Sequence, residues 1–366
     1  MNQVKNTKDL RSYNKKRIID LLRNRELLSK ADIAKSLDVS FATASNLCNE
    51  LLEERIFLTV KKSSITGGRP SELICLNPAS RVSVCMDFTY LNVVRVLLVD
   101  LHNRPMGEIS VPLRNDRSLQ ETLELCMEGY RGLLADAQLE HEQILGMTVV
   151  IPGLYDTQTG GVLNSTLSLL DHHNLESVLR QYIDTTIFIE NDANLAALAV
   201  SMQGEAQQEA NVIFIYIGEG LGMGLLTSEG SVFRGARGFA GEIAHMPLGD
   251  MEYECYCGNH GCLEGVLSNS GIECQLQGQE NAAMEAGNKL GILLSILINM
   301  TDPEAVFIGG DHEGFIQDML PYAQREAGRR ILLQRYRDIP IRITLNVHDL
   351  FYQGASELLI RHWLMK

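Results

Sequence analysis

Proline is scarce in this sequence, and long apolar runs are missing. Only 9 of 366 residues are proline, and no low-complexity tract or repeat of about 20–50 residues is present, which argues against a disordered or solenoid chain. The longest apolar runs, such as Met147–Ile151 and Leu290–Leu297, are too short to cross a bilayer. The first residues carry basic side chains with no apolar stretch behind them, so they do not resemble a secretory signal. We therefore expect a cytoplasmic protein without a membrane partner.

The composition that remains is globular, with 45% hydrophobic and 21% charged residues. At about 100–200 residues per domain, this length predicts two or three domains. The net charge of −14 is unevenly spread, because residues 1–80 contain 14 Lys and Arg against 9 Asp and Glu, whereas residues 81–366 contain 18 against 37. A basic head on an acidic body favours contact between the head and a polyanion. Chance clustering of surface charge is the alternative.

Three helical segments are expected in the head, over residues 14–27, 29–37 and 40–57, from the spacing of their apolar residues. Ser29 and Ser40 are good N-caps for the second and third segments. Two short helices joined by a three-residue turn are typical of helix-turn-helix DNA-binding domains. The outer face of the third segment offers side chains that can reach base edges. The residues expected to contact DNA there are Ser40, Phe41, Thr43, Ser45, Asn46 and Asn49.

Two short strands are expected next, over residues 56–62 and 72–76, and the segment between them contains GGRP. Gly67 and Gly68 permit positive φ at the tip of this hairpin, and Arg69 stands beside them. A guanidinium on a glycine-rich tip suits insertion into a narrow minor groove of DNA. We therefore predict a winged helix-turn-helix domain over residues 1–79. A dimerisation or protein-docking module is the alternative.

Residues 80–366 show two α/β units with the same outline, each opening with three strands in a row. This repetition predicts a duplicated fold with a ligand cleft between two lobes. We place lobe one at residues 80–194 plus the C-terminal helix, and lobe two at residues 195–355. Helices are expected over residues 119–137 and 193–200. The expected strands are 82–88, 92–100, 106–111, 145–151, 186–190, 212–217, 222–227, 231–234 and 306–310.

Three of the eight cysteines crowd into eight positions, Cys255, Cys257 and Cys262, after His245. Three thiolates and an imidazole match tetrahedral zinc and leave no open position for a catalytic water. We therefore predict one structural Zn²⁺ per chain. Unrelated buried thiols are the alternative for this cluster, and they are the expectation for the other cysteines. These are Cys48, Cys75, Cys85, Cys126 and Cys274.

Carboxylates gather near the same motif. Asn191 and Asp192 follow strand 186–190 at its carboxyl end, where ligands bind in open α/β sheets. Glu242 lies one short helical turn before the predicted zinc histidine, and Glu264 follows the last predicted thiolate by two positions. Carboxylates, an amide and an imidazole converging on one cleft would suit the hydroxyls of a neutral polyol. The alternatives are that Asp192 caps a helix and that the glutamates are solvated.

Three motifs in the body resemble one family. GFAGEIAH (238–245), CYCGNHGCLE (255–264) and ENDAN (190–194), behind a head containing GGRP, resemble the ROK family of bacterial sugar repressors and sugar kinases over essentially the whole chain. The resemblance is to the transcriptional-repressor branch, which holds repressors for N-acetylglucosamine and xylose, and it implies an actin-like, hexokinase-like duplicated fold. It also implies that the histidine of the first motif binds both zinc and sugar. The implied sugar-binding residues are Gly153, Asn191, Asp192, Glu242, His245 and Glu264.

Two departures from the family bear on catalysis. A ROK kinase opens its body with Asp-x-Gly-Gly-Thr, but residues 87–91 read DFTYL and lack the glycines that let backbone amides approach phosphates. A second phosphate loop usually reads Gly-Thr-Gly-x-Gly, but here Glu219 replaces the threonine and would repel a triphosphate. Asp192 matches the kinase base. Without a positioned phosphate donor, we expect Asp192 to bind sugar and no residue to be catalytic.

The sequence therefore predicts a ROK-type repressor of carbohydrate-metabolism genes, and not an enzyme. Its head would bind operator DNA as a homodimer or a dimer of dimers, and its body would sense a sugar or a sugar phosphate. One alternative is an active ATP-dependent sugar kinase, similar to glucokinase, that carries a DNA-binding head. The other alternative is a repressor that is controlled by a partner protein.

Overall fold

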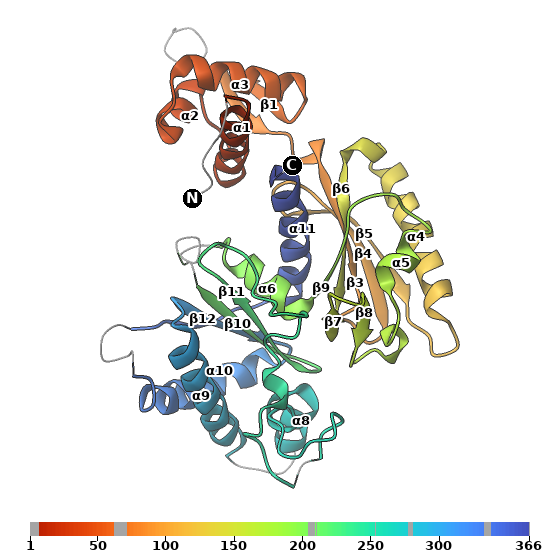
Figure 1. The fold of residues 1–366 in the computed structure, drawn as a ribbon, viewed down its shortest axis with the longest axis vertical. Helices are drawn as coiled ribbons and strands as arrows, with labels where there is room; N and C mark the ends of the chain where they lie inside the picture. The colour runs from red at the N-terminus through yellow and green to blue at the C-terminus, as the bar shows by residue number, and fades with distance from the viewer. Residues whose placement is uncertain are drawn as a thin grey trace.

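A computed structural model (Figure 1) describes residues 7–61, 72–203, 209, 211–252, 254–276, 281–332 and 338–365. The first three helices and a strand pair form a small unit at one end of the molecule, and two α/β units lie below it, with the C-terminal helix between all three (Figure 1). Within these ranges, no helix combines the length and the apolar character that a membrane span requires.

The N-terminal unit follows the predicted helical pattern. Ser29 Oγ accepts a hydrogen bond from the Asp32 amide and Ser40 Oγ accepts one from the Thr43 amide, so both expected N-caps are present. The third helix ends at Glu53 and does not continue to residue 57, because the next strand has begun there. The elements are α1 (Thr7–Asn24), α2 (Lys30–Leu37), α3 (Phe41–Glu53), β1 (Phe57–Lys61) and β2 (Glu72–Leu76).

The first sheet of the body contains five strands in the order β5-β4-β3-β6-β9. Its first three strands form the expected antiparallel meander, and β3, β6 and β9 run parallel, so their carboxyl ends meet at one edge. Helix α4 covers β4 and β5. The elements are β3 (Val82–Asp87), β4 (Val93–Val99), β5 (Pro105–Pro112), α4 (Leu119–Asp136), β6 (Ile144–Ile151), β7 (Leu154–Asp156), β8 (Gly161–Leu163), α5 (Leu175–Leu179) and β9 (Ile187–Asn191).

The second sheet has the order β11-β10-β12-β13 and differs from its prediction. Residues 231–234 do not form a strand, since Val232 makes only an isolated bridge with Leu226. The sheet is completed instead by two parallel strands from the C-terminal part. The elements are β10 (Val212–Ile217), β11 (Leu221–Leu226), α7 (Glu264–Leu267), α8 (Asn269–Leu276), α9 (Ala282–Thr301), β12 (Ala305–Gly310), α10 (Glu313–Gly328) and β13 (Ile341–Ile343).

Two helices, α6 (Asp192–Val200) and α11 (Val347–Met365), lie between the sheets. Helix α6 packs on β10 and β11 of the second sheet, whereas α11 packs on β3 and β6 of the first, and the two helices pack on each other. Their contact is close at Gly354, where a Cβ atom would lie 2.0 Å from the Leu195 carbonyl oxygen. All nine residues of α6 are buried. The predicted boundary at residue 194 falls inside this helix.

The N-terminal unit is attached to the body through α11 and the turn after β4. Leu101, Ile360 and Leu364 belong to the same hydrophobic cluster as the core of the three N-terminal helices. Arg23 on α1 donates a hydrogen bond from Nε to the Leu101 carbonyl oxygen over 2.8 Å. Because α11 also packs on the first sheet, this sheet and the N-terminal unit share one support.

Candidate functional site

A cavity of about 80 Å³ opens at the carboxyl end of β6 and β9, where the first sheet faces α6 and the cysteine-rich loop. Asn191, Asp192 and Gly153 line it from the first sheet, and Glu242, His245 and Glu264 line it from the second unit. The structure thus brings all six predicted ligand-binding residues to one place. Their role in binding remains a prediction.

Asn191 joins the end of β9 to the start of α6. Its Oδ1 accepts a hydrogen bond of 2.9 Å from the Ala193 amide, and its Nδ2 donates one of 3.2 Å to the Gly153 carbonyl oxygen. The N-cap of α6 is therefore Asn191, and the alternative that Asp192 caps this helix is wrong. Gly153 has a φ of +140°, a conformation that side chains disfavour. This pairing fixes one wall of the cavity.

Asp192 is buried at the first position of α6, and its Oδ1 accepts a 2.7 Å hydrogen bond from the Ala193 amide. Burial raises the pKa of Asp192 to about 7, and the negative charge of Asp87 contributes to the increase. Asp87 is itself buried at the end of β3, where its Oδ1 accepts hydrogen bonds from the amide and hydroxyl of Thr89. The carboxyl groups of Asp87 and Asp192 are thus both buried at the carboxyl ends of strands of the first sheet.

The other two carboxyl groups stand next to the cysteine-rich loop. A 3₁₀ turn at Ile243–His245 follows Glu242 directly, which explains why Glu242 and His245 reach the same cavity. The His245 Nδ1 atom lies 3.8 Å from Glu264 Oε2. Loss of water contact, together with the charge of Glu264, raises the pKa of Glu242 to about 7, and burial raises the pKa of Glu264. These groups are oxygen acceptors, and in their protonated forms they also donate.

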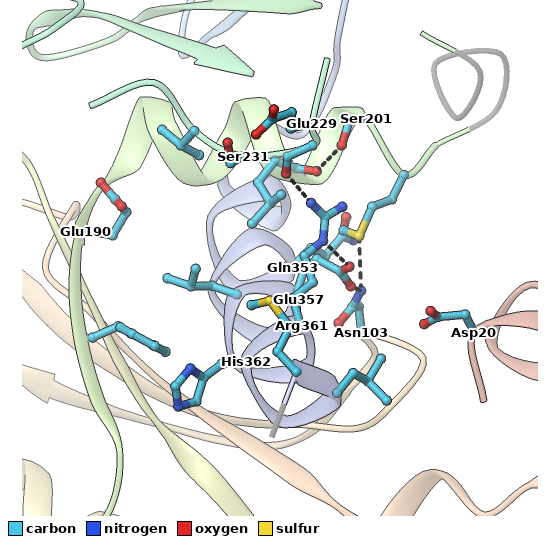
Figure 2. A pocket seen from close by; sticks show the side chains of 18 of the residues that line it. Asp20, Asn103, Glu190, Ser201, Glu229, Ser231, Gln353, Glu357, Arg361 and His362 are labelled. Carbon is cyan, nitrogen blue, oxygen red and sulfur yellow. Dashed lines mark hydrogen bonds and ion pairs between the residues drawn. The ribbon is translucent and has the colours of Figure 1, made fainter. Parts of the chain in front are cut away.

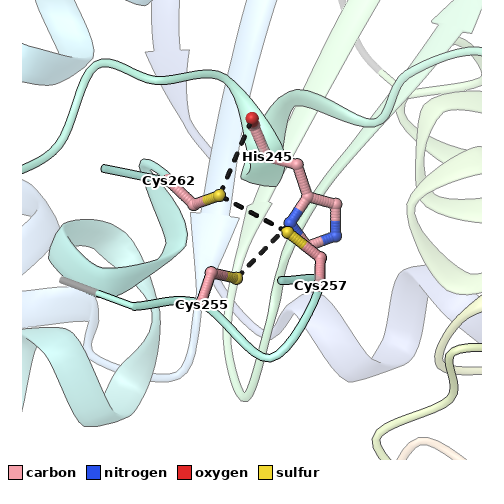
Figure 3. Close-up of side chains that lie close together, drawn as sticks. All are labelled: His245, Cys255, Cys257 and Cys262. Carbon is pink, nitrogen blue, oxygen red and sulfur yellow. Dashed lines mark hydrogen bonds between the residues drawn. The ribbon is translucent and has the colours of Figure 1, made fainter. Parts of the chain in front are cut away.

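His245, Cys255, Cys257 and Cys262 place their ligand atoms within 4.8 Å of one another (Figure 3). The Cys255 Sγ atom lies 3.7 Å from His245 Nδ1, and the Sγ atoms of Cys257 and Cys262 are 3.6 Å apart. The sulfur atoms are too far apart for a disulfide. The four residues form a cluster that could hold a metal ion.

The loop that carries the three thiols turns on two glycines. Gly258 and Gly261 have φ values of +85° and +74°, and a Cβ atom at Gly261 would lie 2.6 Å from Met251 Sδ. The loop closes through hydrogen bonds from the Cys255 amide to the Asn259 carbonyl oxygen, and from the Gly249 amide to the Gly261 carbonyl oxygen. Of the remaining cysteines, Cys48, Cys85 and Cys126 are buried as expected, but Cys274 is exposed and Cys75 is half-buried.

The residues predicted to contact DNA lie at the start and along one face of α3. Phe41, Thr43, Asn46 and Asn49 are exposed, and Ser45 is half-buried. The hydroxyls of Ser40 and Thr43 bond to each other over 2.8 Å, and Asn49 Oδ1 accepts a 2.7 Å hydrogen bond from Lys30 Nζ. Arg69 and the glycines beside it fall outside the described residues. Phe41, with 59% of its surface exposed, is thus accessible at the start of α3.

Sequence reasoning missed Tyr256 as a lining residue of the cavity. Its ring meets His245 edge-on with the centroids 5.5 Å apart, and 63% of its surface is exposed. Its position between Cys255 and Cys257 was a usable signal, because a ring between two converging thiols must lie near the cluster. The further lining residues Thr89, Asn164 and Thr166 carried no comparable signal, since they come from loops far apart in sequence.

A polar network that the sequence did not reveal connects the two units beside the cavity. Asp311 Oδ1 lies 3.1 Å from Nε2 of His348, and Asp311 Oδ2 accepts a 2.8 Å hydrogen bond from Asn269. The His348 ring stacks on Tyr90 with the centroids 4.6 Å apart. The hydroxyl of buried Tyr216 donates to the same aspartate over 3.4 Å. Residues from five separate segments therefore fill this region.

A second hollow, of about 1650 Å³, lies between α1, α11 and the loop after β11, and adjoins the cavity at Asn191 (Figure 2). Several of its charged side chains are paired with one another. Glu357 accepts from Arg23 over 2.6 Å and from Arg361 over 2.7 Å, and Glu190 accepts from Arg234 over 2.6 Å. Although burial opposes it, the two arginines hold the pKa of Glu357 below its usual value. These ion pairs connect α1 with α11, and the end of β9 with the loop after β11.

Comparisons with known proteins identify repressors and kinases that are similar to this chain in sequence and in fold. The chain is 25% identical to the xylose repressor of Caldicellulosiruptor bescii, with 92% of each chain covered. Its fold matches a ROK family transcriptional regulator, a homologue of the Escherichia coli MLC protein, with a TM-score of 0.76 and 20% identity over 97% of this chain and 98% of the other.

A kinase matches about three quarters of the chain. The ROK hexokinase of Thermus thermophilus aligns with a TM-score of 0.62 and 25% identity, covering 77% of this chain and 99% of the kinase. The sequence model of the ROK family matches residues 106–288, which is half of the chain and includes the six predicted sugar-binding residues and the cysteine cluster. The chain therefore belongs to the ROK family.

Proposed function

We propose that this protein is a sugar-responsive, DNA-binding transcriptional regulator, and that it represses carbohydrate-metabolism genes. In this proposal residues 1–79 form a winged helix-turn-helix domain and residues 80–366 form the sugar-binding domain. One observation carries the proposal. Side chains that can bind hydroxyl groups line a cavity, and Tyr90, His348 and Asp311 occupy the region beside it.

The cavity has the chemistry that a sugar requires. Carboxyl oxygens of Asp192, Glu242 and Glu264 can accept hydrogen bonds from hydroxyl groups, and Asn191 and His245 add an amide and an imidazole. Several acceptors around one small cavity recognise a ring that carries hydroxyls in several directions. The xylose repressor relative is named for a response to such a molecule.

The residues beside the cavity support the proposal that the body has lost kinase activity. The segment after β3 has no glycine, and its Tyr90 side chain stacks on His348 where a kinase would need open backbone amides. Asp311 and Glu219 both lie on this side, and both bond to Asn269. Two carboxylates facing a triphosphate would repel it. Asp192 is present in the position of a catalytic base, but it has no donor to act with.

The cysteine cluster fits zinc as a structural ion. Ligand atoms that surround tetrahedral zinc at about 2.0–2.3 Å lie about 3.3–3.8 Å from one another. The separations of 3.7 Å between Cys255 and His245 and 3.6 Å between Cys257 and Cys262 agree. His245, Cys255, Cys257 and Cys262 would complete the coordination and leave no position for a reacting water. The ion would hold His245, and with it one wall of the sugar cavity, in a fixed orientation.

The head would bind operator DNA through α3, with the body assembled as a homodimer or a dimer of dimers to match paired half-sites.

Asn46 is exposed on α3 and has the amide that pairs with adenine. Substitution Asn46→Ala should weaken operator binding by about 1–3 kcal/mol and relax specificity at one base pair. The control Asn24→Ala, at the end of α1, should leave that specificity unchanged. Equal loss on specific and random DNA would contradict this assignment.

The cavity and the head are connected by packed helices. Asp192 begins α6, α6 packs on α11, and the end of α11 enters the hydrophobic cluster of the head. For a sugar to release DNA, it must bind the arrangement without DNA more tightly than the arrangement with DNA. The proposal therefore requires that sugar and operator weaken each other's binding by the same factor.

The decisive experiment selects operator DNA from a random pool with the full chain and then titrates sugars into the complex. A sugar that lowers operator affinity, with no turnover of Mg-ATP, supports the sugar-responsive regulator. Phosphorylation of a sugar above background would overturn the loss of kinase activity and favour a kinase with a DNA-binding head. Operator binding that no sugar alters would favour control by a partner protein.

A further inference from the structure

One continuous segment of the chain lines the cavity at both of its ends. Leu221 and Met223, at the start of β11, line the cavity, and the chain returns to it at Gly241 and Glu242. Between these ends, β11 runs for six residues and the chain then turns back at residues 227–231, called here the β11 turn. A strand of this length covers about 20 Å. The β11 turn is therefore distant from the cavity, although both of its flanks are anchored there.

The β11 turn is held together by hydrogen bonds within it. The Thr227 amide donates to the Ser231 carbonyl oxygen and the Gly230 amide donates to the Thr227 carbonyl oxygen, both over 2.8 Å. The hydroxyls of Thr227 and Ser231 are also 3.0 Å apart. Gly230 has a φ of +73°, which glycine permits. These bonds make the turn a rigid extension of β11, so a movement of the strand displaces the turn.

The β11 turn contacts the C-terminal half of α11 through Arg361. The Arg361 Nη1 atom donates a hydrogen bond to the Gly230 carbonyl oxygen. Figure 2 shows the Arg361 guanidinium directed toward the turn that carries Glu229 and Ser231. The turn and Arg361 both line the hollow of about 1650 Å³. Because this contact borders open space, it can change without the repacking of a core.

Arg361 also binds the carboxylate that attaches the head. Its Nε donates to Glu357 Oε1 over 2.7 Å, while Glu357 Oε2 accepts a 2.6 Å hydrogen bond from Arg23 of α1. Only 5% of the surface of Glu357 is exposed, and hydrogen bonds between charged groups are the strong ones. A displacement of Arg361 therefore acts on a buried carboxylate whose other oxygen holds the head.

The contact between α6 and α11 is a suitable pivot for such a displacement. The two helices touch closely at Gly354 and Leu195, and closely packed surfaces resist sliding. Arg361 lies about 10 Å further along α11, beside the hollow. A rotation of the unit built on the second sheet about the α6–α11 contact would displace the β11 turn further than the contact itself.

We propose that the β11 turn and Arg361 form a relay through which a ligand in the cavity changes the hold of Glu357 on the head. This inference rests on the proposed sugar-responsive function and adds the route of its regulation. Arg361 is a positioning residue, because it lines neither the cavity nor the outer face of α3. Its loss should therefore reduce the coupling between sugar and operator more than it changes the affinity for either one alone.

The test measures the coupling factor, which is the ratio of operator affinities without and with saturating sugar, on the full, metal-loaded chain. The sugars are xylose, glucose, mannose, galactose and N-acetylglucosamine, with the 6-phosphates of the last four, and the operator is selected from a random pool. Coupling factors of about 5–150 are typical, and Arg361→Met should lower the factor by at least about threefold. The control Arg329→Met breaks an exposed pair with Glu326 and should leave it unchanged.

A second variant tests the turn while Arg361 is intact. Thr227→Val removes the hydroxyl that bonds to Ser231 and should lower the coupling factor by loosening the turn. The control Thr301→Val removes a similar hydroxyl bond, to the Leu297 carbonyl oxygen in α9, and should have no effect on coupling. Full coupling in Thr227→Val would exclude the turn from the route and overturn the proposal.

A double variant tests whether the contacts act in series. If Arg361 acts on the head through Glu357, adding Arg23→Met to Arg361→Met should lower the coupling factor no further than the stronger single substitution. Losses that multiply would indicate two independent routes and overturn the relay.

The outcomes separate this inference from the function on which it rests. Coupling in the unmodified protein that Arg361→Met retains in full would overturn the relay and leave the sugar-responsive function standing, with the packed helices as the route. Coupling that both Arg361→Met and Thr227→Val reduce would support both. If no sugar or sugar phosphate of the panel alters operator affinity in the unmodified protein, the sugar-responsive function is overturned and the relay fails with it.

Discussion

In the proposed function, Asp192 keeps the position of a kinase base but has a different role. It is buried, its carboxyl accepts the first amide hydrogen bond of α6, and burial raises its pKa to about 7. In a kinase such a carboxyl would serve as a base. Here, next to a region filled by tyrosine and histidine, the same carboxyl can serve as a hydrogen-bonding partner for a sugar hydroxyl.

The raised pKa of Asp192 predicts a pH dependence of stability. The neutral carboxyl is favoured in the folded state, so its stabilising contribution is fully present below pH about 3.9 and is lost as pH rises through about 7. Asp192→Asn lacks this titration. Between pH 5 and 8 the variant should therefore gain about 1–4 kcal/mol of unfolding free energy relative to the unmodified protein.

Urea denaturation at several pH values measures this difference directly. The control Asp136→Asn, at the exposed end of α4, should follow the unmodified protein at every pH. Glu242 also has a raised pKa, but its contribution cancels because both proteins contain it. A constant difference between the Asp192→Asn variant and the unmodified protein would show that the folded-state pKa of Asp192 is ordinary.

At the scale of the elements, the cysteine-rich loop depends on its metal ligands for its shape. Cys257→Ser replaces one of the four ligands, so the loop should lose its metal and the body about 2–4 kcal/mol of stability. Cys274→Ser is the matched control, because Cys274 is exposed and lies outside the cluster. Elemental analysis should find one zinc per chain in the control and none in the Cys257 variant. Full metal content in both would show that the ligand set is wrong.

The packing of α6 on α11 gives a second prediction at this scale. In Gly354→Ala the new Cβ would lie 2.0 Å from the Leu195 carbonyl oxygen, which should force the helices apart and cost about 1–3 kcal/mol. In Gly132→Ala on α4, no atom lies within 4 Å of the new Cβ, so the variant should be unchanged or stabilised by up to about 1 kcal/mol. Thermal denaturation distinguishes them. Equal effects would mean that the close helix contact is absent.

The elements themselves were predictable where a local signal existed. Apolar segments indicated the first sheet, helical spacing with Ser caps indicated the N-terminal helices, and the 255–262 spacing indicated the metal cluster. The expected strand at 231–234 was wrong, because β12 and β13 complete that sheet. The strand at 306–310 was expected, but no local pattern indicated β13 or the order of the strands. Similarly, Tyr90 and His348 are separated by more than 250 positions, and their stacking arises only from the fold.

At the scale of the whole molecule, the contact between the N-terminal helices and α11, called here the joint, connects the head to the body. Arg23 of the head pairs with buried Glu357 of α11, and Arg361 shares that carboxylate. Arg23→Met should cost about 2–3 kcal/mol, because it leaves a buried charge with one arginine partner in place of two. It should also weaken the effect of sugar on operator affinity, since the head would no longer follow α11.

The joint can be tested with a double-mutant cycle. Adding Glu357→Gln to Arg23→Met removes the buried charge and should recover part of the lost stability. The control Arg104→Met breaks an exposed pair with Glu26 and should change stability by no more than about 0.5 kcal/mol. Fully additive losses in the double variant would show that Arg23 and Glu357 do not interact across the joint.

The side chains beside the cavity bear on how the proposed regulator would respond to the sugar concentration. A kinase consumes the sugar it recognises, and its occupancy depends on turnover and on the supply of ATP. If the body has lost kinase activity, as we propose from Tyr216, His348 and Asp311 in that region, a bound sugar departs chemically unchanged. Occupancy is then an equilibrium that depends on sugar concentration, the dissociation constant and the operator DNA that competes with the sugar. Such a regulator reports nutrient supply without depleting it, and its reading is independent of the energy state of the cell.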